Sequence, residues 1–137
     1  MHRLFLDANV LFSVAYGSPG IGQLWEEQRQ GHCRLMASPY VIEEVKRNLD
    51  QPEQHRRLEE RLEQVALISE PPVDIKCQIE LAEKDRPVFL AALAARATHL
   101  ITGDVRHFGD YFGKKIQGVK ILKPADYLKS LSTAANQ

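Results

Sequence analysis

Two short apolar segments, far apart in the chain, each lead to an aspartate, and this pattern constrains the fold more than any other feature. Residues 3–6 precede Asp7, and residues 100–101 lead through a threonine and a glycine to Asp104. We interpret both segments as β-strands. In open α/β sheets, ligands bind at the carboxyl-terminal ends of the strands. If the two strands are parallel neighbours, the carboxylates of Asp7 and Asp104 converge at that edge.

Strand and helix patterns alternate along the rest of the chain. Helices are predicted from residue 8 to 14 and over residues 21–30, 39–49, 52–66, 74–84 and 86–95, with further strands at 33–37, 65–68 and 119–122 and a last helix from residue 124. This alternation favours an α/β sandwich with a mainly parallel sheet. The 137 residues are enough for one domain with its own core. We place that domain at residues 1–131, followed by a small, polar and flexible tail at residues 132–137.

Two further acids are candidates for the same edge of the sheet. In the third predicted helix the apolar positions fall on one arc about 100° wide; Glu44 lies beside that arc and Glu43 nearly opposite its centre. Asp85 begins the most apolar helix, which leads into the strand before Asp104. Taken singly, each acid has an ordinary explanation, because aspartates often cap helices and shape turns. Taken together with Asp7, they predict one acidic site.

Clustered carboxylates repel one another and lose hydration, so a bound cation is their natural compensation. Four oxygen donors suit Mg²⁺ or Mn²⁺. Zinc would require cysteine and histidine at ligand spacing, which Cys33, Cys77 and the five scattered histidines do not supply. We therefore interpret the four acids as catalytic metal ligands of a nuclease in which metal-activated water attacks a phosphodiester. The sequence contains no GxGxxG, GxxxxGK[ST] or GxSxG motif for other chemistry.

Charge and composition limit the partners and the compartment. The 18 basic and 18 acidic residues give a net charge of zero, which does not favour non-specific nucleic-acid binding. Without the four clustered acids the balance is 18 − 14 = +4, so a nucleic-acid partner is allowed. No apolar run is long enough to span a bilayer, and the start of the chain lacks a signal-peptide pattern. The two cysteines form no CxxC pair. We expect a cytoplasmic protein with reduced thiols and no membrane partner.

Four segments, in their order and spacing, together resemble the PIN-domain nuclease family over nearly the whole chain. They are LDANVL at 6–11, IEEV at 42–45, KDRPVFLAA at 84–92 and LITGDVRHF at 100–108. The resemblance implies a three-layer α/β/α domain in which the acids at the family's positions, Asp7, Glu44, Asp85 and Asp104, cut single-stranded RNA with Mg²⁺ or Mn²⁺. It also implies that Asn9 and Thr102 support the site through hydrogen bonds. Many small members of the family resemble VapC toxins, so a homodimer, an antitoxin partner and a single-stranded or structured RNA substrate are expected.

Several positively charged or titratable side chains near these segments are candidates for phosphate contacts, although a solvated surface position is the ordinary use of each. They are Lys46, Arg47, Arg86, Arg106, His107 and Lys114. Asp110 is a further acid near the site, with an open role. Two alternatives to a nuclease also stay open. One is a non-catalytic PIN-like module that binds RNA or protein, and the other is a phosphotransfer domain with an acceptor aspartate. The set of four acids speaks against the first, and the lack of a second aspartate two residues after Asp7 speaks against the second.

Overall fold

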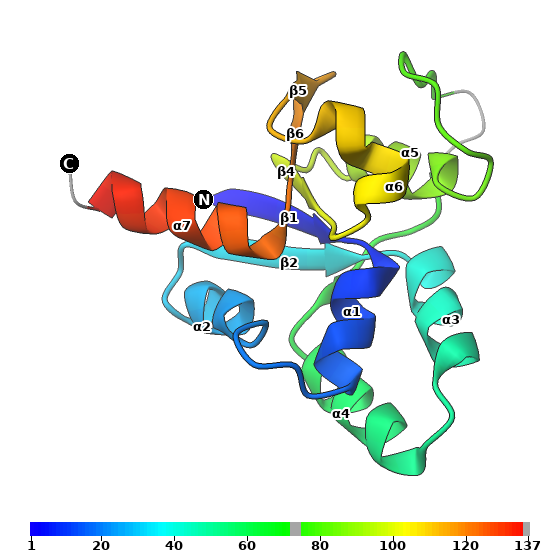
Figure 1. The fold of residues 1–137 in the computed structure, drawn as a ribbon, viewed down its shortest axis with the longest axis vertical. Helices are drawn as coiled ribbons and strands as arrows, with labels where there is room; N and C mark the ends of the chain where they lie inside the picture. Colours follow the sequence, from blue (N-terminus) through cyan, green and yellow to red (C-terminus); the bar gives the residue numbers. More distant parts are fainter. Residues whose placement is uncertain (72–74, 136–137) are drawn as a thin grey trace.

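The computed structural model describes residues 1–71 and 75–135, and its centre is a six-stranded sheet in the order β3-β2-β1-β4-β6-β5 (Figure 1). Neighbouring strands are parallel from β3 to β6, whereas β5 runs antiparallel to β6. The strands are β1 (His2–Leu6), β2 (Cys33–Ala37), β3 (Ala66–Leu67), β4 (His99–Ile101), β5 (Lys115–Ile116) and β6 (Val119–Leu122). The predicted mainly parallel sheet is thereby confirmed.

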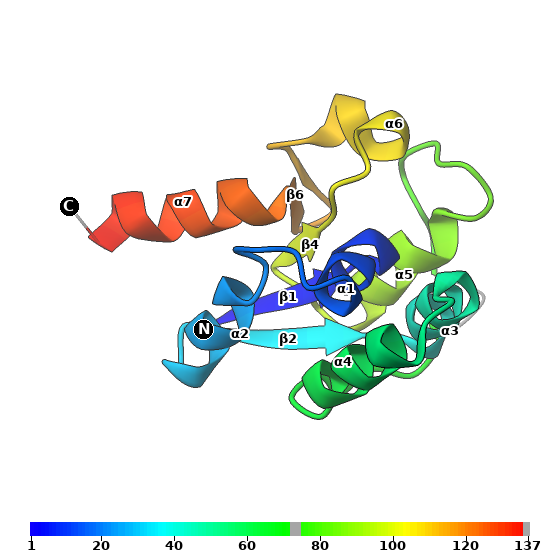
Figure 2. The ribbon, with the colours of Figure 1, turned by 60° about the horizontal axis from the view of Figure 1, so that its bottom comes forward.

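Helices flank this sheet, as two views of the ribbon show (Figures 1 and 2). They are α1 (Ala8–Ala15), α2 (Gln23–Arg29), α3 (Pro39–Asn48), α4 (Pro52–Leu62), α5 (Arg86–Ala94), α6 (Val105–Phe108) and α7 (Pro124–Ala135), with a 3₁₀ turn at Gly109–Tyr111. The arrangement confirms the α/β sandwich expected from the alternation of strand and helix patterns. No helix within the described residues has the length and apolar character needed to cross a membrane.

The strand β1 lies at the point where the order of the sheet reverses. The chain adds β2 and β3 on one side of β1 and then places β4 on the other side. Leu6, the last residue of β1, pairs in register with Ile101, the last residue of β4. The carboxyl-terminal ends of these two strands therefore coincide, and such a switch point is where open α/β sheets form a crevice for ligands.

The core is formed by the sheet and the apolar faces of the helices around it. In β1 the three residues Leu4, Phe5 and Leu6 are fully buried, as expected for a central strand covered on both faces. In α5 the side chains of Val88 and Phe89 are buried, which agrees with a helix whose sequence is apolar nearly all round. Asp7, which follows β1, and Asp85, which precedes α5, are thus attached to buried elements.

The helix predicted over residues 74–84 is wrong for its described part, residues 75–84, which contains no helix. The apolar residues at 75, 77, 79 and 81 are partly or fully buried and alternate with exposed residues, which is the period of an extended chain. Gln117, in the turn between β5 and β6, holds this segment: its side chain accepts from the Gln78 N–H at 2.7 Å and donates to the Lys76 carbonyl at 3.0 Å. Two backbone groups of this segment are thus bonded to a distant side chain. Asp74 lies outside the described residues.

Two other boundaries differ from those expected. The helix predicted over 52–66 ends at Leu62, because Ala66 and Leu67 pair with β2 as strand β3. The last helix continues to Ala135, past the boundary predicted at 131. Small residues with high helix propensity such as alanine extend a helix readily, which the expectation of a tail neglected. Residues 136–137 lie outside the described residues.

Candidate metal centre

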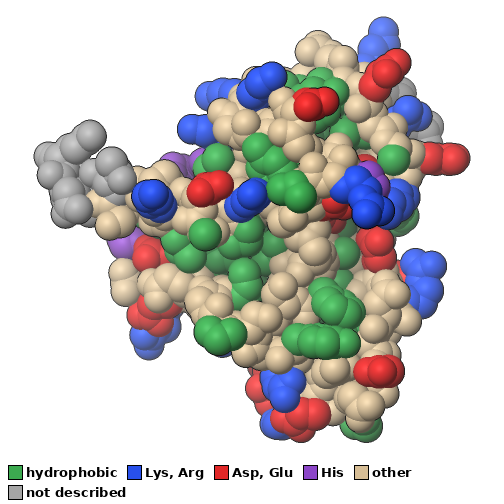
Figure 3. Space-filling model, viewed as in Figure 1, with side chains coloured by type: hydrophobic (Ala, Val, Ile, Leu, Met, Phe, Trp, Pro, Cys, Tyr) green, Lys and Arg blue, Asp and Glu red, His purple; other side chains and the backbone are tan. Residues whose placement is uncertain are grey.

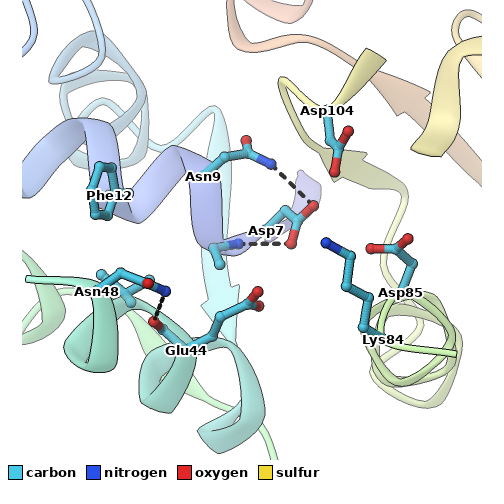
Figure 4. A pocket seen from close by; sticks show the side chains of 10 residues that line it. Asp7, Asn9, Phe12, Glu44, Asn48, Lys84, Asp85 and Asp104 are labelled. Carbon is cyan, nitrogen blue, oxygen red and sulfur yellow. Dashed lines mark hydrogen bonds between the residues drawn. The ribbon is translucent and has the colours of Figure 1, made fainter. Parts of the chain in front are cut away.

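A pocket of about 350 Å³ opens where β1 and β4 end (Figure 4). It is lined by Asp7, Ala8, Asn9, Phe12, Glu44, Val45, Asn48, Lys84, Asp85 and Asp104. The four acids singled out in the sequence are all on its wall and come from four places: Asp7 follows β1, Glu44 lies on α3, Asp85 precedes α5 and Asp104 follows β4. The structure therefore brings the four together, while their roles in metal binding and catalysis stay predictions.

The carboxylate of Asp7 is buried, with 5% of the residue exposed, and it is held by three donors. Its Oδ1 accepts from the Ala8 N–H at 2.7 Å, which caps α1. Its Oδ2 accepts from Thr102 Oγ1 at 2.9 Å and from Asn9 Nδ2 at 3.2 Å. These bonds fix the direction of the carboxylate before any ligand arrives.

Asn9 and Thr102 extend this network from β1 to β4. Asn9 Nδ2 also donates to Thr102 Oγ1 at 3.1 Å, and Asn9 Oδ1 accepts from the Gly103 N–H at 2.7 Å. Thr102, which is fully buried, accepts a further bond from the Asp104 N–H at 3.1 Å. A Cβ atom at Gly103 would lie 3.4 Å from Asn9 Oδ1, at the near limit of ordinary van der Waals contact. Asn9 and Thr102 thus contact Asp7 in the way that the sequence resemblance implied.

Burial and neighbouring charges act on the acids of the pocket. The pKa of Asp7 is raised to about 6, mainly by burial and further by the charges of Glu44 and Asp85, against the opposing bonds from Thr102 and Ala8. Burial also raises the pKa of Asp85, with a contribution from Asp104. Burial is the largest cause of the raised pKa at both residues, and at Asp85 the charges of His107 and Lys84 act against it.

The residues Asp85, Asp104 and His107 form the tightest group of possible ligands. One ligand atom from each lies within 4.8 Å of the other two. His107 Nδ1 is 2.7 Å from Asp104 Oδ2 and 3.2 Å from Asp85 Oδ2. Asp85 Oδ2 is buried and has no hydrogen-bond partner among the described residues, and its contact with His107 Nδ1 is an ion pair only when the imidazole is protonated.

A divalent cation fits this arrangement. A buried carboxylate oxygen without a donor is costly, and a cation would satisfy it together with the neighbouring acids. The donors are mostly carboxylate oxygens, which hard cations prefer, and His107 adds a nitrogen. Sequence reasoning had treated His107 as a phosphate contact and missed it as a possible ligand. The sequence did contain a signal for this role: His107 lies three residues after Asp104, which places the two side chains one helical turn apart.

The two neighbouring glutamates of α3 separate as the helical phase predicted. Glu44 is half-buried at the pocket, whereas Glu43 is exposed and lines a different groove beside Ile42 and Lys46. The arc of apolar positions on the predicted helix was therefore sufficient to identify Glu44, and not Glu43, as the glutamate at the pocket.

Most of the basic side chains proposed for phosphate contacts do not reach the pocket wall. Lys46 forms an exposed ion pair with Glu59 of α4 at 3.0 Å and lies outside the pocket lining, so its contact with phosphate stays a prediction. Four others from the sequence, together with the acid Asp110, are exposed and outside the pocket lining: Arg47, Arg86, Arg106 and Lys114. Acidic and basic side chains are interspersed over the face seen in Figure 3. The basic residue that does line the pocket is Lys84, which sequence reasoning missed although it directly precedes Asp85.

Comparison with known proteins gives a family and a fold. Residues 3–106 match the model of the PIN domain. The chain is similar to the crystal structure of VapBC2 from Rickettsia felis bound to a DNA fragment from their promoter, with 15% identity, a TM-score of 0.63, and coverage of 88% of this chain and 98% of that chain. It is also similar to VapBC-1 from nontypeable Haemophilus influenzae, with 18% identity, a TM-score of 0.59, and coverage of 90% and 98%. At these identities the likeness concerns the fold. Among curated proteins, none matches.

Proposed function

The chain belongs to the PIN domain family, and on that premise we propose that it is a divalent-metal-dependent endoribonuclease that hydrolyses single-stranded RNA. The observation that carries the proposal is the buried Asp85 Oδ2, which has no hydrogen-bond partner among the described residues and lies in a pocket walled by three more acids. The carboxylates that line this pocket have the chemistry of a cation site.

In this proposal, Asp7, Glu44, Asp85 and Asp104 hold Mg²⁺ or Mn²⁺, which when bound activates water and stabilises charge on the phosphodiester. The chain itself positions the ligands. The bonds from Thr102 and Asn9 keep Asp7 Oδ2 directed at the pocket. The carboxylates must be ionised to bind a cation, so the raised pKa of Asp7 makes metal binding compete with protons.

We also propose that the protein acts as the toxin of a toxin–antitoxin pair and works as a homodimer in the cytoplasm. The likeness of its fold to chains of two VapBC structures supports the antitoxin partner, whereas the homodimer and the compartment rest on the sequence analysis alone. Light scattering on the purified protein measures the dimer directly. Purification of the tagged chain from the cells that produce it naturally, followed by identification of any stably bound protein, measures the antitoxin.

The competing function is a non-catalytic PIN-like module that binds RNA or protein. The four acids of the pocket favour the nuclease, as does Asp85 Oδ2, which has no hydrogen-bond partner among the described residues, because a binding module needs no cation there. Calorimetric titration with Mn²⁺ separates the two, since uptake of Mn²⁺ lost in Asp85→Asn supports the nuclease.

The test of catalysis is cleavage of a mixed single-stranded RNA by the purified protein with Mn²⁺, with Mg²⁺ and with EDTA. We expect metal-dependent cutting that falls about 100-fold or more in Asp7→Asn and in Asp104→Asn, because each removes a charged ligand. The matched control is Asp110→Asn, an exposed acid outside the pocket, which keeps wild-type activity. Full activity in both pocket variants would overturn the assignment.

A further inference from the structure

The side chain of Lys84 enters the pocket of four acids. Figure 4 shows its amino group directed into the space between the carboxylates of Asp7 and Asp85. Asp104 and Glu44 border the same space. A lysine on the surface of a protein ordinarily extends into water, where its ammonium group is best hydrated. Its direction here is explained by the negative charge of the pocket.

A hydrogen bond holds the backbone at Lys84, whereas its side chain can change its conformation. The Lys84 carbonyl accepts a hydrogen bond of 2.8 Å from the hydroxyl of Tyr40, at the start of α3. The next residue, Asp85, is anchored in turn by a bond of 2.9 Å from its N–H to the Ala82 carbonyl. Lys84 is an exposed residue, and among the described residues no ion pair holds its ammonium group. The four-carbon stem can therefore swing out of the pocket about a fixed base.

We propose that Lys84 is a built-in competitor of the metal: its ammonium group occupies the acidic pocket of the metal-free protein and leaves when a divalent cation binds. The inference rests on the proposed function, because it assumes that the four acids form the metal site. In the metal-free state one tethered positive charge partly compensates the clustered carboxylates. In the loaded state the same charge would repel the cation over a few ångströms, where Coulomb energies in a partly buried site are considerable. Lys84 therefore sets the concentration of metal at which the site fills.

Metal affinity, measured without any RNA, tests this directly. We expect Lys84→Met to bind Mn²⁺ about tenfold more tightly than the wild type in calorimetric titration, because the competing charge is gone. Lys84→Arg keeps the charge and is expected to stay close to the wild type. The matched control is Lys120→Met, an exposed lysine on β6 outside the pocket, with unchanged affinity. Unchanged or weaker Mn²⁺ binding in Lys84→Met would overturn the proposal.

Thermal unfolding gives a second readout that a merely structural role would not produce. In EDTA, Lys84→Met is expected to melt below Lys84→Arg, because the carboxylates lose their counter-charge. With saturating Mn²⁺ the order is expected to reverse or the difference to vanish. A deficit of the same size with and without Mn²⁺ would assign Lys84 to the fold alone and reject the competition.

The two proposals fail in different ways. If the wild type binds Mn²⁺ and cuts RNA, and Lys84→Met binds Mn²⁺ equally tightly, then the role of Lys84 is rejected and the nuclease assignment stands. If the wild type binds Mn²⁺ but cuts no RNA, and Lys84→Met binds Mn²⁺ more tightly, then the competition between Lys84 and the metal stands and the catalytic assignment is rejected. A wild type that takes up no Mn²⁺ or Mg²⁺ overturns both.

Discussion

At the scale of single residues, Asp7 serves the fold and the site with its two carboxylate oxygens. Oδ1 caps α1 through the Ala8 N–H, and Oδ2 is held by Thr102 and Asn9 at the pocket. A cap alone would not need such deep burial, because most capping aspartates keep contact with water. The burial of the Asp7 carboxylate therefore lowers the stability of the folded state.

That cost makes stability depend on pH in the metal-free protein. The pKa of Asp7 is raised to about 6 in the folded state, against about 4 in an unfolded chain. The folded state binds the proton more tightly, so stability falls as the pH rises from about 4 to about 6. In urea unfolding with EDTA, we expect the wild type to gain stability relative to Asp7→Asn when the pH is lowered through this window. Parallel pH profiles for the two proteins would contradict the raised pKa.

Thr102 is the second residue on which the site depends. Its buried hydroxyl donates to Asp7 and accepts from Asn9 and Asp104. We expect Thr102→Val to lower the free energy of unfolding by about 1–3 kcal/mol, because the shape is kept while buried polar groups lose a partner. Thr102→Ser keeps the hydroxyl and is expected to cost about 0.8 kcal/mol for the lost methyl group. Urea denaturation measures both, and a serine variant as unstable as the valine variant would refute the role of the hydroxyl.

At the scale of elements, the segment 75–82 combines its own alternation of apolar and polar residues with hydrogen bonds from a distant turn. Gln117 sits in the two-residue turn between β5 and β6 with a φ of 51°, followed by Gly118 with a φ of 87°. Two positive φ angles are typical of a type I′ hairpin turn. The same turn aims the Gln117 amide at the backbone of Lys76 and Gln78.

We expect Gln117→Asn to release this segment while keeping the hairpin. Asparagine tolerates the left-handed conformation, but its side chain is one methylene shorter and does not span both backbone partners. Hydrogen exchange at the Gln78 amide, which donates to Gln117, should become about tenfold faster or more, because its opening no longer breaks this bond. Exchange at the Ile121 amide in β6 serves as the internal control. An unchanged rate at Gln78 would show that other contacts hold the segment.

At the scale of the whole molecule, metal binding and folding are coupled because the four acids come from four separate places in the chain. At free Mn²⁺ one hundred times its dissociation constant, mass action should stabilise the folded state by about 2.7 kcal/mol. We expect Glu44→Gln to lose most of this gain and Glu43→Gln, its exposed neighbour on α3, to keep it. Thermal unfolding with and without Mn²⁺ measures the gain. Equal gains in the two variants would remove Glu44 from the site.

Sequence reasoning was reliable where one local pattern specifies the answer. An apolar run that ends shortly before an aspartate specified the ends of β1 and β4. The positions of the apolar residues on the predicted helix α3 separated Glu44 from Glu43. It was wrong for residues 75–84, where a period of two was interpreted as a helix. The alternation of apolar and polar residues was a local signal of an extended chain, whereas the hydrogen bond from Gln78 to Gln117, about forty positions away along the chain, was not visible in any local window.

The sequence by itself determined the alternation of strands and helices, the four acids and the family resemblance, because side-chain period and order along the chain are local properties. Only the tertiary structure decided what surrounds those acids. It buried Asp85 Oδ2 without a donor among the described residues, placed His107 beside it and turned Lys84 into the pocket while sending Lys46 to Glu59. Burial and proximity between distant segments depend on how the whole chain packs, and no window of the sequence contains that information.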